Sequence, residues 1–202
     1  MENFIYCTEE EIIDYLRRFG EGRDSRDTEL SEAVRLKRLY EKEFKRPFLI
    51  GVPVALEGLR QMKSGAATKS DVIKKFRKDD TDVDILIIGA VDSSATPRDG
   101  FSGDVFQMKR LTDRQFNGDF TASVTNELQK IFAKNYSPSP YLNLYLALNL
   151  APQMHAPDWQ ALADFCANHQ VPFVRIILGP IMTEGGDELL IEIYPRLRTV
   201  KL

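Results

Sequence analysis

Three polar side chains lie in or beside two apolar segments of the sequence, and their chemistry suits the hydrolysis of a phosphodiester bond. Asp84 opens one apolar run, and Gln107 and Lys109 lie inside the next. Because side chains alternate between the two faces of a strand, Gln107 and Lys109 are expected side by side on one face. One carboxylate, one neutral oxygen donor and one lysine are the groups that metal-assisted hydrolysis of such a bond requires.

The two apolar runs, 84–89 and 105–111, are typical of strands that pack into a core. The connection 92–103 is rich in Ser, Pro and Gly and predicts a flexible hairpin loop. If the two strands pair as a long hairpin, the three polar side chains converge into one cluster. Two neighbouring strands are therefore the elements that must position this chemistry.

The composition is that of a soluble globular protein with ordinary charge. The 202 residues are 43% hydrophobic and 28% charged, which is enough apolar material for one domain with a proper core. The net charge of −3 shows that the chain as a whole is not a basic nucleic-acid binder. Basic residues do cluster locally, and solvated helix faces are the ordinary explanation for such runs. The clusters are Arg35, Lys37 and Arg38; Lys74, Lys75, Arg77 and Lys78; and Lys109, Arg110 and Arg114.

Cysteine, histidine and hydropathy patterns argue against several other classes. Cys7 and Cys166 lie far apart without metal-ligand spacing, so neither a disulfide scaffold nor a zinc site is expected. His155 and His169 flank a predicted helix without a spaced acidic or Cys partner, which argues against a histidine metal pair. The N-terminus shows no signal-peptide pattern, and the longest apolar run, 141–150, is too short to span a bilayer. We therefore expect a soluble, cytoplasmic protein that does not enter a membrane.

The first half of the chain predicts two helices, one strand and a charged helical segment. Residues 8–11 resemble a capping box at the start of a helix. Apolar residues recur at helical spacing over 30–44, and a proline closes this second helix. Residues 48–56 predict a strand, and 57–78 predict a charged helical insertion.

The second half continues this alternation. A helix is expected to begin at Asp119 or Thr121, and Glu188 and Glu192 are expected to be solvated at the edge of the sheet. The predicted elements are a helix to about residue 135, a strand over 141–150, a helix over 157–169, and strands over 173–178 and 189–194. Such an alternation of helices and strands indicates an α/β fold with a mixed sheet.

This order of elements, with Asp84 opening one strand and Gln-x-Lys in the next, resembles the PD-(D/E)XK nuclease superfamily. That superfamily includes many restriction endonucleases and archaeal Holliday-junction resolvases. Its core is a helix, a three-strand meander, a crossover helix and a further strand, and the resemblance covers residues 28–150. The sequence departs from the pattern at two positions. Gln107 stands where most members have an acid, although some branches have Gln there, and Val83 rather than Pro precedes Asp84.

The resemblance implies a restriction-endonuclease-like core in which a central mixed β-sheet is flanked by helices. Residues 1–202 would form a single nuclease-like domain. Residues 1–27 would be an N-terminal helical extension of this domain, and 57–80 would be a helical insertion.

The activity that the resemblance implies is metal-dependent hydrolysis of nucleic acid, with DNA as the expected substrate. Mg²⁺ or Mn²⁺ would bind the side-chain oxygens of Asp84 and Gln107 and the backbone carbonyl of Met108. Lys109 would position or help to deprotonate the attacking water and stabilise charge on the phosphate. Glu32, on the first core helix, would supply a compensating acid.

Two parts of this assignment stay open. Glu29 and Glu43 lie on the same helical stripe as Glu32, and a surface glutamate in a charged helix is the ordinary explanation for all three. Such nucleases often act as dimers to cut two strands, so a homodimer is an assembly to test. The sequence identifies no self-complementary surface.

Two other functions remain as alternatives. Nuclease-like folds are often retained as binding modules after the loss of an acid, and Gln107 would mark such a loss here. The segment with Asp82 and Asp84 also resembles the Asp-x-Asp strand of nucleotidyltransferases, in which both acids hold metal. That family places a Gly-Ser turn shortly before the acids to cradle phosphates, and this sequence has none in the preceding stretch 70–80.

Overall fold

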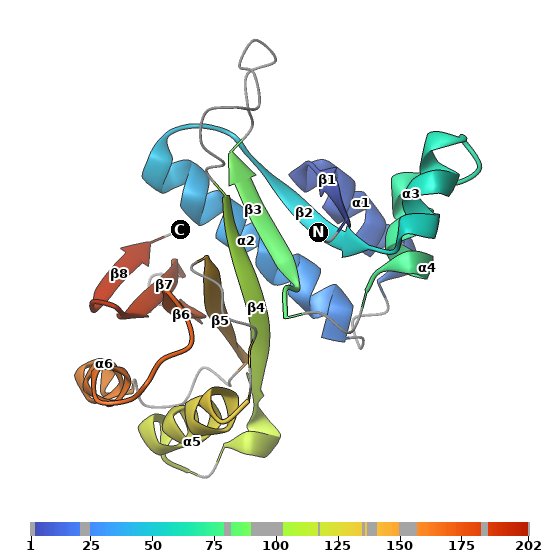
Figure 1. Ribbon diagram of the computed structural model, residues 1–202. Coiled ribbons are helices and arrows are strands. Elements are labelled where there is room, and N and C mark those ends of the chain that lie inside the picture. Colours follow the sequence, from blue (N-terminus) through green and yellow to red (C-terminus); the bar gives the residue numbers. More distant parts are fainter. Residues whose placement is uncertain are drawn as a thin grey trace. The chain divides into compact units, whose positions relative to one another are not determined.

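Figure 1 shows the computed structural model, an α/β fold in which a central mixed β-sheet is flanked by helices. The predicted fold class is confirmed. In the described part of the chain the sheet has eight strands, in the order β1-β2-β3-β4-β5-β6-β7-β8. The chain divides into two compact units, Met1–Phe106 and Gln107–Leu202, and β4 contributes residues to both. The structure describes residues 3–20, 25–78, 82–89, 103–116, 118–134, 136, 141–149, 157–182 and 186–201.

The first unit combines antiparallel strands with helices that cover them. Its elements are β1 (Asn3–Cys7), α1 (Glu9–Phe19), α2 (Ser25–Phe44), β2 (Phe48–Val54), α3 (Leu56–Lys63), α4 (Lys69–Phe76), β3 (Ile85–Gly89) and the first four residues of β4 (Gly103–Thr112). Each strand pairs antiparallel with the next, from β1 to β4. The predicted meander of strands is therefore present.

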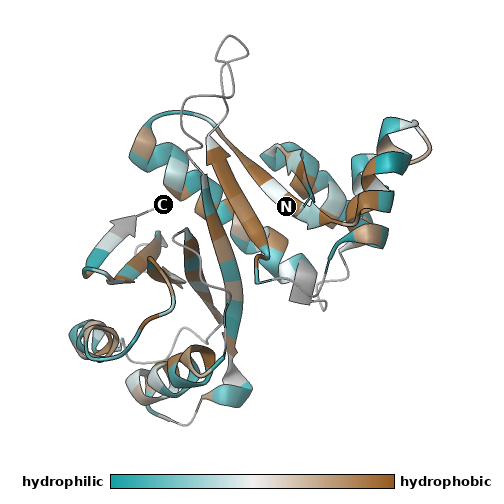
Figure 2. Ribbon diagram, viewed as in Figure 1, coloured by the Kyte–Doolittle hydropathy of each residue, from teal (hydrophilic) through white to brown (hydrophobic). Residues whose placement is uncertain are grey.

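The core of the first unit lies between its strands and α2. Nearly all of β2 is buried, and β2 and β3 are the most hydrophobic strands of this unit in Figure 2. Leu30, Leu36 and Leu39 of α2 are buried as well, which matches the helical spacing in the sequence. Burial of these apolar faces is the main favourable contribution to the stability of the unit.

The N-terminal segment contains one predicted and one unpredicted element. The capping box at the start of α1 is confirmed, because the Thr8 side chain accepts from the Glu11 N–H and the Glu11 side chain accepts from the Thr8 N–H. The helix is preceded by β1, which the sequence analysis did not predict. This strand has only five residues and pairs with β2 about fifty positions away, so little in its local pattern identifies it.

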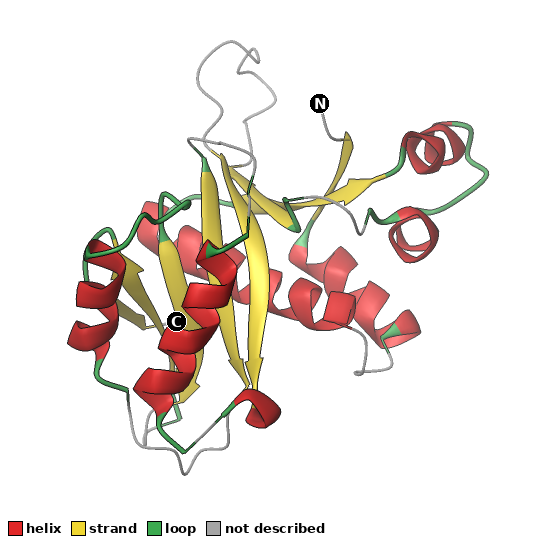
Figure 3. Ribbon diagram, turned by 60° about the horizontal axis from the view of Figure 1, so that its bottom comes forward, coloured by secondary structure: helices red, strands yellow, loops and turns green. Residues whose placement is uncertain are grey.

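A pair of short helices, α3 and α4, separates β2 from β3, as the charged segment predicted. Gly58 lets these helices approach closely, because a Cβ atom at this position would lie 2.6 Å from Cγ1 of Val72 and 2.8 Å from Cβ of Phe76. Thr68 caps α4 through a second capping box with Asp71. Figures 1 and 3 show the two helices side by side beyond the end of β2.

Substitution of Gly58 by alanine is expected to destabilise the first unit by about 1–3 kcal/mol, because the added methyl group overpacks the contact with Val72 and Phe76. The higher helix propensity of alanine, worth about 1 kcal/mol, offsets part of this cost. Urea unfolding followed by far-UV circular dichroism measures the change. In a Val72→Ala background, which lacks the nearest atom, Gly58→Ala should cost less than it does in the wild type. A Gly58→Ala protein as stable as the wild type would contradict the close packing.

The second unit contains the rest of the sheet and two helices. Its elements are the remainder of β4, a 3-10 helix (Asp113–Gln115), α5 (Phe120–Phe132), β5 (Leu142–Asn149), α6 (Trp159–Ala167), β6 (Ile176–Met182), β7 (Glu188–Tyr194) and β8 (Arg198–Lys201). The β5–β6 pair is parallel, whereas β6–β7 and β7–β8 are antiparallel. This combination makes the sheet mixed.

Aromatic side chains join the two helices of the second unit. Phe132 of α5 stacks on Phe165 of α6 with ring centroids 6.1 Å apart, and Phe120 packs edge-on against Trp159 at 6.3 Å. Figure 3 shows α5 and α6 side by side in front of the strands of this unit. Asp119 rather than Thr121 caps α5 by accepting from the Ala122 N–H, so the first of the two predicted starts is correct.

The C-terminal strands differ from the sequence prediction in two ways. The strand predicted over 173–178 begins at Ile176 and continues to Met182, because a bulge between Leu178 and Ile181 accommodates Gly179 and Pro180. The strand β8 was not predicted, since its four residues contain only one apolar side chain. Because β8 pairs with β7, the last predicted strand is not an edge strand.

Both cysteines are buried free thiols. Burial raises the pKa of the Cys7 thiol to about 12, and burial also raises the pKa of the Cys166 thiol to about 12. Both thiols therefore stay protonated at neutral pH and pack as small apolar groups. Every helix in the described ranges is too short or too polar to cross a bilayer. His155 and the connection predicted over 92–103, up to residue 102, lie outside the described residues.

Candidate hydrolytic site

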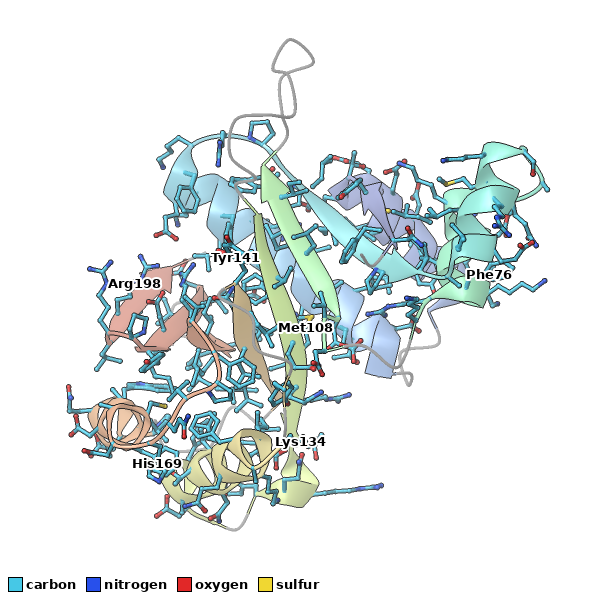
Figure 4. All side chains as sticks on the ribbon, in the orientation of Figure 1. Phe76, Met108, Lys134, Tyr141, His169 and Arg198 are labelled. Carbon is cyan, nitrogen blue, oxygen red and sulfur yellow. The ribbon has the colours of Figure 1, made fainter. Side chains whose placement is uncertain are left out.

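Four of the predicted site residues lie on the elements that the sequence assigned to them, and Asp84 lies one residue before the strand that it was predicted to open. Asp84 directly precedes β3, and Glu32 lies on α2; both belong to the first unit. Gln107, Met108 and Lys109 lie within β4 and belong to the second unit, and Figure 4 shows Met108 partway along this strand. Convergence of all five residues into one site stays a prediction.

The position of Asp84 follows from the pairing of β3 with β4 inside the first unit. Ile85 is opposite Phe106 in the antiparallel register, and the backbone N–H of Asp84 donates to the Phe106 carbonyl oxygen at 2.9 Å. Asp84 is therefore fixed to the backbone of β4 at the residue before Gln107. Its side chain is partly buried, as expected for a residue at the beginning of a core strand.

The exposure of the predicted residues increases along β4, from Gln107 and Met108 to Lys109. Only 4% of Gln107 and 3% of Met108 is exposed, whereas Lys109 is partly exposed. The Gln107 Nε2 donates a long hydrogen bond of 3.5 Å to the Met108 carbonyl oxygen. Because Gln107 and Lys109 are two positions apart in a continuous strand, they share one face of β4, as the sequence predicted.

Glu32 is buried and already has a cationic partner. Its side chain is 10% exposed, and Oε1 accepts from Arg35 Nη1 at 2.5 Å on the next turn of α2. The guanidinium group offsets the negative charge of the carboxylate, so a metal ion would compete with Arg35 for this oxygen. Glu29, the alternative on the same helix, pairs with Arg77 at 2.8 Å. These ion pairs weaken both glutamates as candidate metal ligands.

A further acid, which was not among the predicted site residues, lies at the start of β4. The Tyr40 hydroxyl of α2 donates to the carboxylate of Asp104. Asp104 lies two positions before Phe106 and therefore on the same face of β4 as that buried ring. An isolated Asp before an apolar run is the only signal that the sequence offered, and it does not reveal the tyrosine.

A second missed feature corrects the prediction that Glu192 is solvated at a sheet edge. Its side chain is 5% exposed, and Oε2 accepts from Arg175 Nη2 at 2.7 Å and from Arg198 Nη2 at 2.8 Å. The strand β8 covers this edge and brings Arg198 opposite Glu192. Paired and hydrogen-bonded burial is the condition under which a carboxylate is tolerated inside a protein.

The metal-ligand chemistry of the described residues is limited. Within the described ranges, no three side chains of the types His, Cys, Asp and Glu are grouped to hold a metal ion. The predicted set of Asp84, Gln107 and the Met108 carbonyl contains a single carboxylate and is of a different kind. His169 packs on Phe165 and lies 2.7 Å from its carbonyl oxygen through Nδ1, which is an ordinary role at the end of a helix.

The chain was compared with protein-family models, with curated proteins and with solved structures. None of the three comparisons gives a match.

Proposed function

We propose that this protein hydrolyses phosphodiester bonds of nucleic acid, with DNA as the expected substrate, and that Asp84, Gln107 and Lys109 carry the reaction. The observation that best supports the proposal is the hydrogen bond from the Asp84 N–H to the Phe106 carbonyl, which ties Asp84 to the residue preceding Gln107. The β3–β4 pairing that the chemistry requires is thus present in the first unit.

The predicted donors fit a hard divalent ion in type. The Asp84 carboxylate, the Gln107 amide oxygen and the Met108 carbonyl are all oxygen donors, which Mg²⁺ and Mn²⁺ prefer, and Asp84 contributes the one formal charge. Bound there, such an ion would act as a Lewis acid on a phosphate oxygen. Because Gln107 is neutral, we expect weaker ion binding than at a site with two carboxylates.

Lys109 has a separate role in the proposal. Its partial exposure lets the amine reach a phosphate outside the strand, while the neighbouring Gln107 on the same face stays buried. The amine would orient the attacking water, and as an ammonium group it would offset the charge that builds on the phosphate oxygens.

Supercoiled plasmid incubated with the protein and Mg²⁺ or Mn²⁺ should be converted to nicked circles, and EDTA should prevent the conversion. The same ions should raise the melting temperature of the protein, because a ligand that binds only the folded state stabilises it. Asp84→Asn should remove both effects. Absence of nicking with either ion, in protein that remains folded, would contradict the proposal.

A nuclease-like module without activity is the second candidate, and the Glu32–Arg35 ion pair favours it. Arg35 offsets the charge of Glu32, and Gln107 is uncharged, so the predicted set offers an ion less negative charge than a site with two carboxylates. In that case neither nicking nor an ion-dependent rise in melting temperature should be observed. Transfer of a labelled nucleotide to RNA or protein would instead support the Asp82/Asp84 nucleotidyltransferase alternative.

A further inference from the structure

The segment that forms α3 and α4 has a charge opposite to that of the whole chain. Residues 56–78 contain seven Lys and Arg and only two acids, Glu57 and Asp71, so their net charge is +5, whereas the whole chain carries −3. Two further acids, Asp79 and Asp80, follow this segment directly. A positive segment in an acidic protein points to a local role for the charge rather than to general solubility.

Three of the seven basic residues have acidic partners in the structure. Arg77 is 3% exposed and pairs with Glu29 at 2.8 Å, which anchors the end of α4 to α2. Lys69 pairs with Glu11 of α1 at 2.9 Å, and Arg60 has a looser 4.0 Å contact with Glu57. The first two pairs connect the segment to α2 and α1, and in the third the charge of Arg60 is offset within α3.

The other four basic residues of the segment are exposed. They are Lys63, Lys74, Lys75 and Lys78, and none has an acidic partner among the described residues. We call these four lysines, together with exposed Arg18 at the end of α1, the basic surface.

Contacts between α1 and α4 position part of the basic surface. Lys74 lies over the Phe19 ring of α1 at 4.4 Å from its centroid, which places the end of α1 beside α4. Asp71, the one acid of α4, is committed to Thr68. The hydrogen bonds from Thr68 lower the pKa of Asp71, and the positive charge of Arg18 contributes to the same shift. The capping role leaves this acid less available to neutralise the lysines.

We propose that the basic surface binds the phosphate backbone of double-stranded nucleic acid. Lysine ammonium groups act as point charges that contact phosphates without reading sequence. Val72 and Ile73 of α4 are buried and Phe76 is only partly exposed, so the exposed face of α4 lacks the apolar stripe of a helix that inserts into a lipid surface. Phe19 and Phe76 each have a lysine over the ring, which disfavours the base stacking used to bind single strands.

This surface gives the proposed nuclease a contact with its substrate away from the hydrolytic residues, and in that respect it rests on the proposed function. The proposal that the basic surface binds phosphates and the proposal of hydrolysis can be contradicted separately. Phosphate contacts on the basic surface need no metal ion, whereas nicking does. Binding measured in EDTA therefore tests the surface without testing hydrolysis.

The test is fluorescence anisotropy of a labelled DNA duplex of about 25 base pairs, titrated with full-length protein in EDTA at several salt concentrations. We expect Lys74→Ala/Lys75→Ala to weaken binding at least about tenfold. The slope of log K against log salt should fall by about 2, roughly 0.9 for each lost phosphate contact. Both lysines are exposed on a helix, so the variant should keep the wild-type circular dichroism spectrum.

Lys130→Ala/Lys134→Ala is the matched control, because it removes the same charge from exposed positions on and just after α5. It should bind DNA as the wild type does. The proposal is overturned by any of three results: no duplex binding by the wild type at low salt, equal losses in the two double variants, or binding to phosphatidylserine vesicles in place of DNA.

Discussion

Replacement of Lys109 by alanine is expected to reduce plasmid nicking by at least about a hundredfold, the lower end of what a positioned proton-transfer or charge-stabilising group contributes. Single-turnover nicking in Mg²⁺ measures the rate. The fold should be unaffected, because Lys109 is partly exposed and has no hydrogen bond or ion pair among the described residues. A loss of activity at unchanged melting temperature would assign Lys109 to the chemistry.

Arg110→Ala is the matched control for this result. Arg110 is the next residue in β4 and is exposed, but strand alternation places it on the other face from Lys109. It removes the same charge at nearly the same place and should leave nicking within a few-fold of the wild-type rate. Equal losses in the two variants would indicate a general contribution of charge to DNA binding, and the catalytic role of Lys109 would be abandoned.

Gln107→Glu tests whether residue 107 contacts a metal ion by adding a negative charge at this position. A carboxylate at this position doubles the formal charge available to an ion, so the melting temperature should rise more steeply with Mg²⁺. Without the ion, the new charge at a position only 4% exposed should destabilise the protein. A variant whose melting temperature is the same with Mg²⁺ and with EDTA would show that residue 107 does not contact an ion.

Glu192→Ala is expected to have the largest effect on stability, about 3–5 kcal/mol, because it leaves two guanidinium groups without their shared carboxylate. Arg175 and Arg198 both donate to Glu192 Oε2, and their side chains are only 15% and 32% exposed. Arg198→Ala should cost less, since Arg175 would still pair with the buried acid.

Urea unfolding followed by tryptophan fluorescence isolates this effect. Trp159 is the only tryptophan of the chain, and it lies on α6 in the second unit. The transition that it reports should shift for Glu192→Ala and stay unchanged for Gly58→Ala, which alters the first unit, provided that the units unfold separately. A Glu192→Ala protein within 1 kcal/mol of the wild type, a value far below the expected range, would show that the cluster is not a stabilising ion pair.

Local patterns in the sequence were sufficient for most elements. The helical spacing of Leu30, Leu36 and Leu39 and the capping box at Thr8 identify their helices because the determining contacts lie within a few residues. The strands β1 and β8 were missed for the opposite reason. Both strands are short. The strand β1 forms by pairing with a distant segment, and β8 has little apolar content of its own.

The candidate site was predicted less completely than its elements. The sequence placed Asp84 within one residue of the start of β3, and it placed Gln107 and Lys109 on one face of β4, since strand alternation is a local property. The Glu32–Arg35 pair and the burial of Gln107 depend on packing, which spacing does not reveal. The prediction that Glu192 is solvated was wrong for the same reason, because its partners Arg175 and Arg198 come from outside its own strand.

The two ends of the α3–α4 segment meet at the sheet. Val54, the last residue of β2, forms a bridge with Arg77, and the Ala55 N–H donates to the Phe76 carbonyl at 2.8 Å. A segment whose entry and exit are one hydrogen bond apart can be exchanged for a short turn, or for another pair of helices, without redirecting the strands on either side. The charge that this protein presents to its partners can therefore change in evolution or by engineering as a separate module, while β2, β3 and the residues beside them stay as they are.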